Sequence, residues 1–231
     1  MSAPLPPGQR DIGFFPRFGV PDFAAFIPQA GEVSLQLGGN LSRPTTLRLA
    51  DLQKLPRREV QADFHCVATW SYRGLRWEGW SLKDVYDTFV APLALAGATD
   101  SYLELRAQDG YRVSLLLADA LVPEVLLADR LNGEPLSTEH GAPLRLVAPA
   151  LYGYKNVKHL STINLRSDYE VGLVERNTRA HPRGRVAFEE RGRGLPGWLY
   201  RILYRALFRP ILWRYHRVER AAAERAHRRK G

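Results

Sequence analysis

The chain is poor in cysteine, and Cys66 is its only one among 231 residues. A lone cysteine excludes an internal disulfide and every zinc site built on paired cysteines. It also excludes a CxxCH haem attachment and the cysteine set of an iron–sulfur cluster. If the chain carries out redox chemistry, we therefore expect its electrons to pass through a separate electron-transfer protein.

Long apolar segments are missing as well. No run of about eighteen uninterrupted apolar residues occurs, so the sequence predicts no ordinary membrane span. The opening segment, residues 1–8, has neither the basic region nor the apolar region of a secretory signal. On these grounds we expect a cytoplasmic protein.

Charge is distributed unevenly along the chain, whose formal net charge is +9. Residues 183–231 hold 14 Lys and Arg against 4 Asp and Glu, whereas the other 182 residues hold 19 against 20. The basic character therefore belongs to the C-terminal segment and not to the rest of the chain.

Composition and pattern divide the chain into four parts. Residues 1–30, rich in Pro, Phe and Gly, predict an irregular arm, and the charged residues 176–194 predict a linker. Residues 195–231 predict a basic amphipathic helical tail. Between them, residues 31–175 predict an α+β domain of mixed β-sheets with short helices. Strands are expected at 33–37, 43–49, 58–65, 102–105, 111–115, 124–129, 144–147 and 157–165, and helices at 51–55 and 81–89.

The tail has a regular pattern of its own. Arg201, Arg205 and Arg209 line one face of a helix that large apolar residues otherwise fill, and Pro210 is expected to break or kink it. Such a helix suits the surface of an anionic membrane. It equally suits packing on the main domain or on a second subunit. Nucleic acid is a poor candidate partner, because the charge lies on one helix instead of along a groove.

Two distant segments carry chemistry. Cys66 follows an apolar run at a strand end, where a thiolate can bind a soft metal, although a buried core cysteine is the simpler interpretation. Much later in the chain, residues 152–158 are rich in Gly and Lys and can hold a phosphate. Together the two segments indicate an anionic metal cofactor held between distant parts of one domain.

Four motifs in order resemble the oxidoreductase molybdopterin-binding domain of the sulfite oxidase family. The resemblance is greatest to the bacterial branch that includes the catalytic subunit of the protein-methionine-sulfoxide reductase. It covers about residues 10–170 and implies the fold of that family. The motifs are LGG at 37–39 with LRLADL at 47–52, HCVATWS at 65–71 with WEGWSL at 77–82, HGAPLRLVAP at 140–149, and LYGYKNVK at 151–158.

The resemblance implies a molybdenum–molybdopterin cofactor and assigns roles to particular residues. Cys66 is implied as the protein ligand to molybdenum at the catalytic centre. His140 and Arg145 are implied as donors to the pterin or its phosphate, a task that a bidentate guanidinium suits. The remaining implied cofactor contacts are Gly153, Lys155, Asn156, Val157 and Lys158, together with Arg17 in an N-terminal arm that crosses the cofactor.

Simpler interpretations of these residues stay open. His140 precedes a Gly-Ala-Pro turn and can be a solvated loop histidine. Arg145 lies in an alternating strand that can turn it toward water. Lys155 and Lys158 can belong to a solvated basic face.

The activity implied by the resemblance is oxygen-atom transfer to or from a small oxyanion, sulfoxide or N-oxide, with the cofactor supplying the chemistry. Ala107 stands where the reductase branch has a cofactor-binding Thr. The basic residues with which the sulfite-oxidising branch holds its substrate have no evident counterparts, which counts against sulfite oxidation. We expect a cytoplasmic enzyme, either free or peripheral at the inner membrane face. The competing interpretation is a non-catalytic binding module of the same fold, attached to a membrane or partner by its basic tail.

Overall fold

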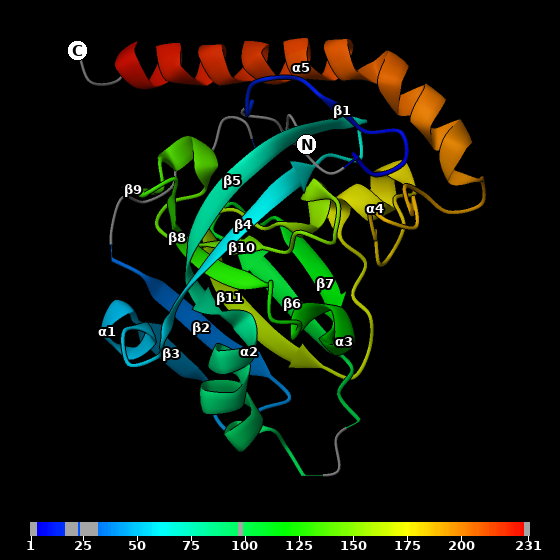
Figure 1. Ribbon diagram of the computed structural model, residues 1–231. Helices are drawn as coiled ribbons and strands as arrows, with labels where there is room; N and C mark the ends of the chain where they lie inside the picture. Colours follow the sequence, from blue (N-terminus) through cyan, green and yellow to red (C-terminus); the bar gives the residue numbers. More distant parts are fainter. Residues whose placement is uncertain (1–3, 17–22, 24–31, 97–98, 229–231) are drawn as a thin grey trace.

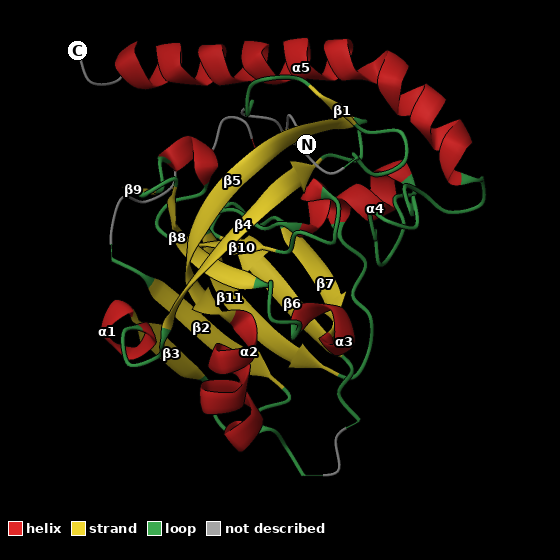
Figure 2. Cartoon of the chain, in the orientation of Figure 1, coloured by secondary structure: helices red, strands yellow, loops and turns green. Residues whose placement is uncertain are grey.

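Two mixed β-sheets form the centre of the protein, and short helices lie around them (Figures 1 and 2). The computed structural model describes residues 4–16, 23, 32–96 and 99–228. The predicted α+β class with mixed sheets is confirmed. Helix α5 (Gly197–Arg228) is by far the longest described helix and lies along the outer edge of the molecule (Figure 1).

The first sheet carries the candidate site. Its strands are β1 (Arg10–Asp11), β4 (Arg57–His65), β5 (Trp70–Ser81), β8 (Leu126–Leu131), β9 (Glu134–Pro135) and β10 (Arg145–Val147). They pair in the order β1-β5-β8-β10, with β4 added to β5 and β9 added to β8. Every pair is antiparallel except β1 with β5. Because β5 pairs with three strands, it is the central element of this sheet.

The second sheet pairs in the order β3-β2-β11-β6-β7. Its strands are β2 (Ser34–Gly39), β3 (Thr45–Arg48), β6 (Tyr102–Ala107), β7 (Arg112–Leu116) and β11 (Leu160–Arg166). The β6–β7 hairpin is the one that the sequence predicts, and β11 joins it antiparallel while running parallel to β2. The strand that follows the candidate phosphate-binding segment is therefore the middle of the second sheet.

The main hydrophobic core draws residues from both sheets. Leu35 on β2 and Leu105 on β6 point into it by strand alternation, and Leu127 and Leu146 reach it from the first sheet. Helices cover its margins: α1 (Leu49–Leu52), α2 (Leu82–Val85) with a π-helical extension (Tyr86–Val90) and a 3-10 turn (Ala91–Leu93), α3 (Leu117–Ala120) and α4 (Leu173–Thr178). The helix predicted at 51–55 is α1, which begins earlier, and the one predicted at 81–89 is α2 with its extension.

Strand β5 is the largest difference from the sequence prediction, which assigns no strand to residues 70–81. Trp70, Trp77 and Trp80 on this strand are all fully buried, so burial on both faces removes the alternation that marks a half-exposed strand. Gly79 interrupts the pattern for a packing reason, because a Cβ there would lie 2.0 Å from the Leu127 carbonyl oxygen.

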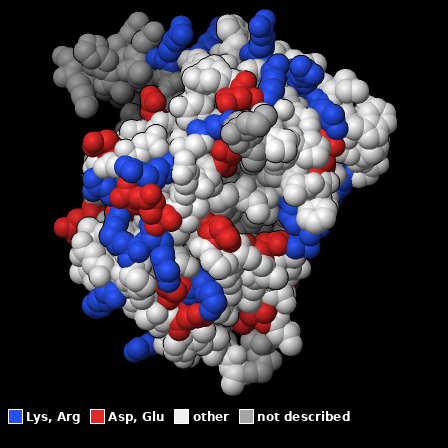
Figure 3. Space-filling view, viewed as in Figure 1, with Lys and Arg blue, Asp and Glu red and all other residues white. Residues whose placement is uncertain are grey.

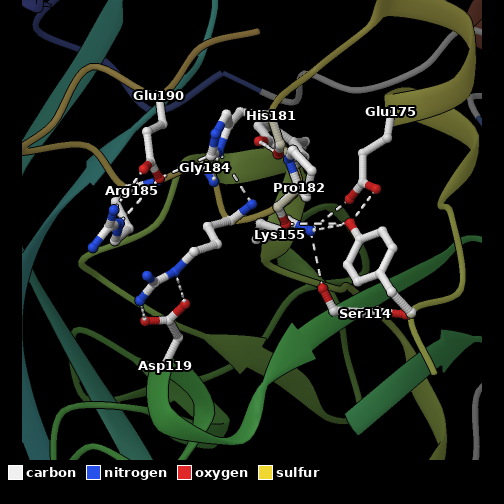
Figure 4. Close-up of polar contacts among 12 residues, drawn as sticks. Ser114, Asp119, Lys155, Glu175, His181, Pro182, Gly184, Arg185 and Glu190 are labelled. Atoms are coloured by element: carbon white, nitrogen blue, oxygen red, sulfur yellow. Dashed lines mark hydrogen bonds and ion pairs between the residues drawn. The ribbon is translucent and has the colours of Figure 1, made fainter. Parts of the chain in front are cut away.

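Residues 176–194, predicted as a linker, pack against the domain instead. Ala180 and Val186 are buried, and Arg191 has no exposed surface. Arg183 joins this segment to α3 through two hydrogen bonds to Asp119, at 2.6 and 2.8 Å (Figure 4). Composition alone does not predict this packing, because several of the residues that hold the segment against the domain are charged.

Helix α5 continues through Pro210 without a break, and Figure 1 shows that it changes direction along its length. One of its faces packs on the rest of the chain through Tyr200, Tyr204, Phe208 and Tyr215, which are all buried. The search for membrane-spanning helices among the described residues finds none of sufficient length and hydropathy.

Candidate cofactor site

Cys66 lies at the tip of the hairpin that joins β4 to β5. Its N–H donates to the Trp70 carbonyl at 2.8 Å, and the Thr69 N–H donates back to the Cys66 carbonyl at 3.1 Å. Thr69 closes the turn in the left-handed region, at φ +72°. A β-branched residue in that region stores strain, and strain of this kind concentrates at functional sites.

The Cys66 side chain is held in an apolar surrounding. It is 7% exposed and belongs to a buried cluster with Ala68, Trp70 and, from helix α5, Phe208. Burial raises the pKa of the Cys66 thiol to about 12, opposed in part by a hydrogen bond from the Ala68 backbone and by the charge of Arg191. Without a metal the thiol therefore stays protonated, and binding a metal ion would release its proton.

The N-terminal arm contacts this turn directly. The Gln9 side-chain amide donates to the Cys66 carbonyl at 3.1 Å, and its oxygen accepts from the Ser71 hydroxyl at 3.0 Å. The same hydroxyl lies 2.7 Å from Nδ1 of His65. Residues before and after the hairpin tip are thus fixed by one chain of hydrogen bonds.

Arg145, on β10, is a fully buried cation that has no carboxylate partner among the described residues. Its Nη1 donates to the His140 carbonyl at 2.8 Å, while Nη2 is buried and finds no hydrogen-bond partner in the described part of the chain. The guanidinium lies 4.8 Å from the Trp77 ring centroid and 5.9 Å from that of Phe64. Burial lowers the pKa of Arg145 to about 9. A desolvated guanidinium with a free donor is costly unless an anion meets it.

His140 ends a 3-10 turn (Thr138–His140) beside Arg145. Its ring stacks on that of Phe15 at 4.8 Å, and its Nδ1 is buried with no hydrogen-bond partner from any residue that the structure describes. Burial, and then the charges of Lys158 and Arg145, lowers the pKa of His140 to about 4, so the ring is neutral near pH 7. The water-facing interpretation of Arg145 is wrong, because its side chain is fully buried. His140 is half-buried, and its ring is covered on one side by Phe15.

Gly141 makes the approach of these residues possible. It has φ +107°, and a Cβ in its place would lie 3.0 Å from Cβ of Lys158 and 3.1 Å from Cβ of Arg145. The Lys158 ammonium donates to the Glu139 carbonyl at 2.7 Å, which places this lysine on the His140 turn. The structure thus brings together His140, Arg145 and Lys158.

Phe64 links this group to the Cys66 turn. It lies beside Arg145, and a Cβ on Gly153 would meet its ring at 2.6 Å. The same Cβ would lie 3.5 Å from the His65 carbonyl oxygen. Gly153, which opens the 3-10 turn Gly153–Lys155, is therefore packed against the hairpin that presents Cys66.

Two of the predicted contacts serve the fold through their side chains. Asn156 accepts from the Ala148 N–H at 2.7 Å and donates weakly to the carbonyls of Leu151 and Tyr152, so it fixes the loop after β10. Val157 is fully buried in the main core. A cofactor could meet these residues only through their backbone.

Lys155 differs from the prediction most clearly, as Figure 4 shows. Its ammonium is fully buried and bonds to Glu175, to the Ser114 carbonyl at 2.9 Å and to the Tyr169 hydroxyl at 3.2 Å. An ammonium has three donors, and these partners use all of them. The Lys155 side chain is thus a structural ion-pair partner, and the solvated-face interpretation is also wrong for it. Arg17 lies outside the described residues.

Arg191 is a buried cation near Cys66 that the sequence analysis does not identify. Its Nη1 donates to the Val67 carbonyl at 2.7 Å and its Nη2 to the Pro7 carbonyl at 3.0 Å, while Glu189 accepts from its Nε at 3.2 Å. It therefore ties residues 176–194 to the turn and to the arm. No local signal marks it, because the surrounding sequence alternates Arg and Gly as a solvated segment would.

The residues present fit an anionic cofactor that contains a soft metal. The site offers one thiol, and close to it a buried guanidinium nitrogen and a neutral imidazole nitrogen that both lack partners. Both unpartnered atoms could be satisfied by an anionic ligand with hydrogen-bonding heteroatoms. If these side chains served only the fold, their two unpaired nitrogen atoms would destabilise the folded state with nothing to offset the loss.

Comparison with known proteins supports the assignment of an anionic metal cofactor to this site. A family profile described as "Oxidoreductase molybdopterin binding domain" matches residues 23–173. The chain is 35% identical over 176 residues to the uncharacterized oxidoreductase YuiH of Bacillus subtilis (strain 168), covering 76% of this chain and 86% of that protein. It is 31% identical over 170 residues to sulfite oxidase of Arabidopsis thaliana, covering 61% of this chain but only 43% of that enzyme.

A solved structure agrees on the fold. The sulfane dehydrogenase SoxCD from Paracoccus pantotrophus superposes with a TM-score of 0.51 at 22% identity, over 66% of this chain and 43% of that one. Membership of the methionine-sulfoxide reductase branch stays a prediction. With the thiol, the buried cations and the profile match in agreement, the chain belongs to the molybdopterin-binding sulfite oxidase family and is a molybdopterin-dependent oxidoreductase.

Proposed function

We propose that this oxidoreductase transfers an oxygen atom to or from a small sulfoxide, N-oxide or oxyanion, and exchanges electrons with a separate protein. The observation that carries the proposal is that Phe64 packs on the Cys66 cluster and also lies 5.9 Å from the Arg145 guanidinium, whose Nη2 has no hydrogen-bond partner among the described residues. Such a thiol and guanidinium suit a cofactor that is a soft metal at one end and an anion at the other.

In this proposal each side chain has a definite task. Cys66 gives up its proton and holds the metal through Sγ. Nη2 of Arg145 donates to the anionic part of the cofactor, and Nδ1 of His140 adds a neutral hydrogen-bonding group. Lys158 and backbone N–H groups of the segment that begins at Gly153 approach from the other side. When bound, molybdopterin supplies a molybdenum ion that changes oxidation state by two electrons as an oxygen atom is transferred.

The apolar covering of Cys66 has a role of its own in the proposal. Phe208 from α5 and Phe15 from the arm lie in the cluster around the thiol and exclude water there. Exclusion of water strengthens the electrostatic interactions of nearby charges such as Arg191. The chain's own contribution is to bind the cofactor, orient it and keep its surroundings dry.

The substrate, the electron-transfer partner and the cytoplasmic location belong to the proposal too. The sequence favours a sulfoxide or N-oxide over sulfite, because the basic residues expected around a bound oxyanion have no evident counterparts. The single cysteine supports an external electron carrier, because a c-type haem and an iron–sulfur cluster both need more than one cysteine for attachment.

Metal and pterin analysis tests the proposal. The protein is purified from a host that makes molybdopterin, beside Cys66→Ser and a matched control, Val67→Ala, which alters the same turn without removing a ligand. We expect molybdenum near one per chain in the wild type and the control, and loss of metal or of activity in Cys66→Ser. Folded wild-type protein without molybdenum or pterin would contradict the proposal and favour a binding module.

A substrate screen then separates the remaining possibilities. Reduction of sulfoxides and N-oxides is assayed with an artificial electron donor, and sulfite oxidation with an artificial acceptor. Turnover of any of them establishes oxygen-atom transfer. Bound cofactor without turnover in either direction would indicate a cofactor carrier.

A further inference from the structure

Helix α5 has a second face that the fold does not use. Its buried residues Tyr200, Tyr204, Phe208 and Tyr215 recur at helical spacing and define the inner face. The outer side nevertheless exposes large apolar side chains: Trp198, Ile202, Leu203, Leu207 and Trp213, which are between 46% and 63% exposed. By helical periodicity Ile202 and Trp213 lie opposite the inner face, whereas Trp198, Leu203 and Leu207 lie along its flanks. A helix that needed only to pack on the domain would carry polar residues there.

The charge of this outer side has one sign. Between residues 197 and 218 the sequence has five arginines and no Asp or Glu. Arg201 is engaged by Glu189, whereas Arg205, Arg209, Arg214 and Arg217 are exposed. Basic side chains line the upper edge of the molecule in Figure 3, where α5 lies.

Exposed apolar side chains and basic side chains together line a groove along the outer side of the helix. It has a volume of about 530 Å³, and Arg209, Trp213, His216, Arg217 and Arg220 are among its lining residues. The Arg217 guanidinium lies 5.3 Å from the Trp213 ring centroid. Such a groove offers an aromatic wall and several cationic donors to a phosphate group.

We propose that the outer side of α5 docks flat on an anionic phospholipid surface. The exposed tryptophans stand fifteen positions apart, about 22 Å along the helix. The helix lies along the outer edge of the molecule in Figure 1 and bends along its length, so a planar surface can approach the part that follows that edge. Tryptophan and leucine enter the interfacial region while long arginine side chains reach phosphates, which is the pattern of a helix lying in a membrane interface.

An anionic membrane fits this surface better than a protein partner does. The apolar side chains spread over a wide convex arc instead of forming the narrow stripe that a second helix would fill. The groove beside Trp213 is lined by the cationic side chains of Arg209, Arg217 and Arg220. The uniform positive charge complements any anionic surface without a fixed register. Because Phe208 on the inner face belongs to the Cys66 cluster, docking would set the cofactor site about one helix diameter, roughly 10 Å, from the lipid headgroups.

Vesicle binding tests the inference with the full chain, in the same preparation that is analysed for molybdenum. Vesicles of phosphatidylcholine alone and of phosphatidylcholine with phosphatidylglycerol are compared by co-sedimentation at low and high salt. We expect binding to the anionic vesicles only, weakened by salt.

Ile202→Ser with Leu203→Ser should lower the partition coefficient by roughly tenfold or more. Arg209→Gln with Arg217→Gln should lower it by roughly thirtyfold, because two cations that meet the anionic surface are removed.

Tryptophan emission gives an independent readout. Trp70, Trp77 and Trp80 are buried, so a blue shift on vesicle addition must come from Trp198 or Trp213. Trp213→Phe should reduce the shift while preserving most of the binding. The matched control is Leu95→Ser, which removes an exposed apolar side chain that is not part of α5 and should change nothing.

Three outcomes would overturn the inference. One is unchanged emission and no co-sedimentation with anionic vesicles. Another is binding that the α5 variants do not weaken relative to Leu95→Ser. The third is a dimer in solution that Ile202→Ser with Leu203→Ser dissociates, which would make the outer side an interface between two copies of the chain. None of these results depends on whether the protein contains molybdenum, so the proposed function is tested separately.

Discussion

Arg145 and Lys155 are both fully buried cations that precede β11, and both are implied as cofactor contacts by the same resemblance. Lys155 is met by Glu175 and two further acceptors, which use all of its donors. Arg145 is met by backbone carbonyls and aromatic faces, with one nitrogen left over. Burial depth does not distinguish a structural cation from a ligand-binding one; the set of partners does. The partners of Arg191 are intermediate between those of Arg145 and Lys155, because it bonds to two carbonyls and one carboxylate.

The largest effect is expected for Lys155→Met. Loss of the ammonium leaves Glu175 buried without its counter-charge, which should lower the free energy of unfolding by about 3–5 kcal/mol. Urea denaturation followed by far-UV circular dichroism measures it. The double variant with Glu175→Gln should recover part of the loss. If the single variant is as stable as the wild type, the ion pair between Lys155 and Glu175 does not stabilise the fold, and the comparison with Arg145 fails.

Arg145→Met is expected to act on the cofactor instead of the fold. The free energy of unfolding of cofactor-free protein should change by less than about 1 kcal/mol, because removal of an unpaired buried charge offsets the lost hydrogen bond to the His140 carbonyl. Cofactor retention should fall by roughly tenfold to a hundredfold, the value of a hydrogen bond to a charged group. Arg145→Lys keeps the charge but not the planar fork and serves as the control. Destabilisation equal to that of Lys155→Met would remove the contrast between the two cations.

The pH dependence of cofactor-free protein tests whether His140 is held neutral. Its pKa is lowered from 6.5 to about 4 in the folded state, so between these values the unfolded chain binds a proton that the folded chain does not. Stability is therefore greatest above pH 6.5 and falls as the pH drops toward 4. Burial lowers the pKa of His65 and His181 as well, so only the part that disappears in His140→Gln belongs to His140. An identical pH profile in the variant would show that the ring is not buried as described.

Glu189→Gln should give the smallest effect. Glu189 accepts from Arg191 and, at 2.8 and 2.9 Å, from Arg201 at the start of α5. Glutamine keeps an amide oxygen that can accept from the buried Arg191, which also bonds to two carbonyls. Arg201 is partly exposed, so the ion pair with it contributes on the order of 1 kcal/mol or less. Hydrogen exchange at the first turns of α5 should speed up slightly while β5 is unaffected. Equal acceleration in both elements would mean that Glu189 supports the whole domain.

The sequence predicts the parts of this protein whose pattern is local. The β6–β7 hairpin and the strands around the main core follow from alternation and turn residues such as Gly110. Strand β5 is missed because its tryptophans are buried on both faces, and residues 176–194 are misread because buried Arg191 looks solvated in composition. The assignment of Cys66, His140 and Arg145 to the cofactor stays a prediction of the motifs. No sequence pattern could tell Arg145 from Lys155, because the difference lies in Glu175, which is distant along the chain.

The covering of Cys66 has a consequence for the order of events during synthesis. The turn itself is complete once β5 has formed, but its cover combines Gln9 and Phe15 from the beginning of the chain with Phe208 near its end. Contacts with so large a sequence separation form late, and a ribosome needs on the order of seconds to add the intervening residues. Until the residues of α5 have been added, the side of the thiol that Phe208 covers lacks that cover.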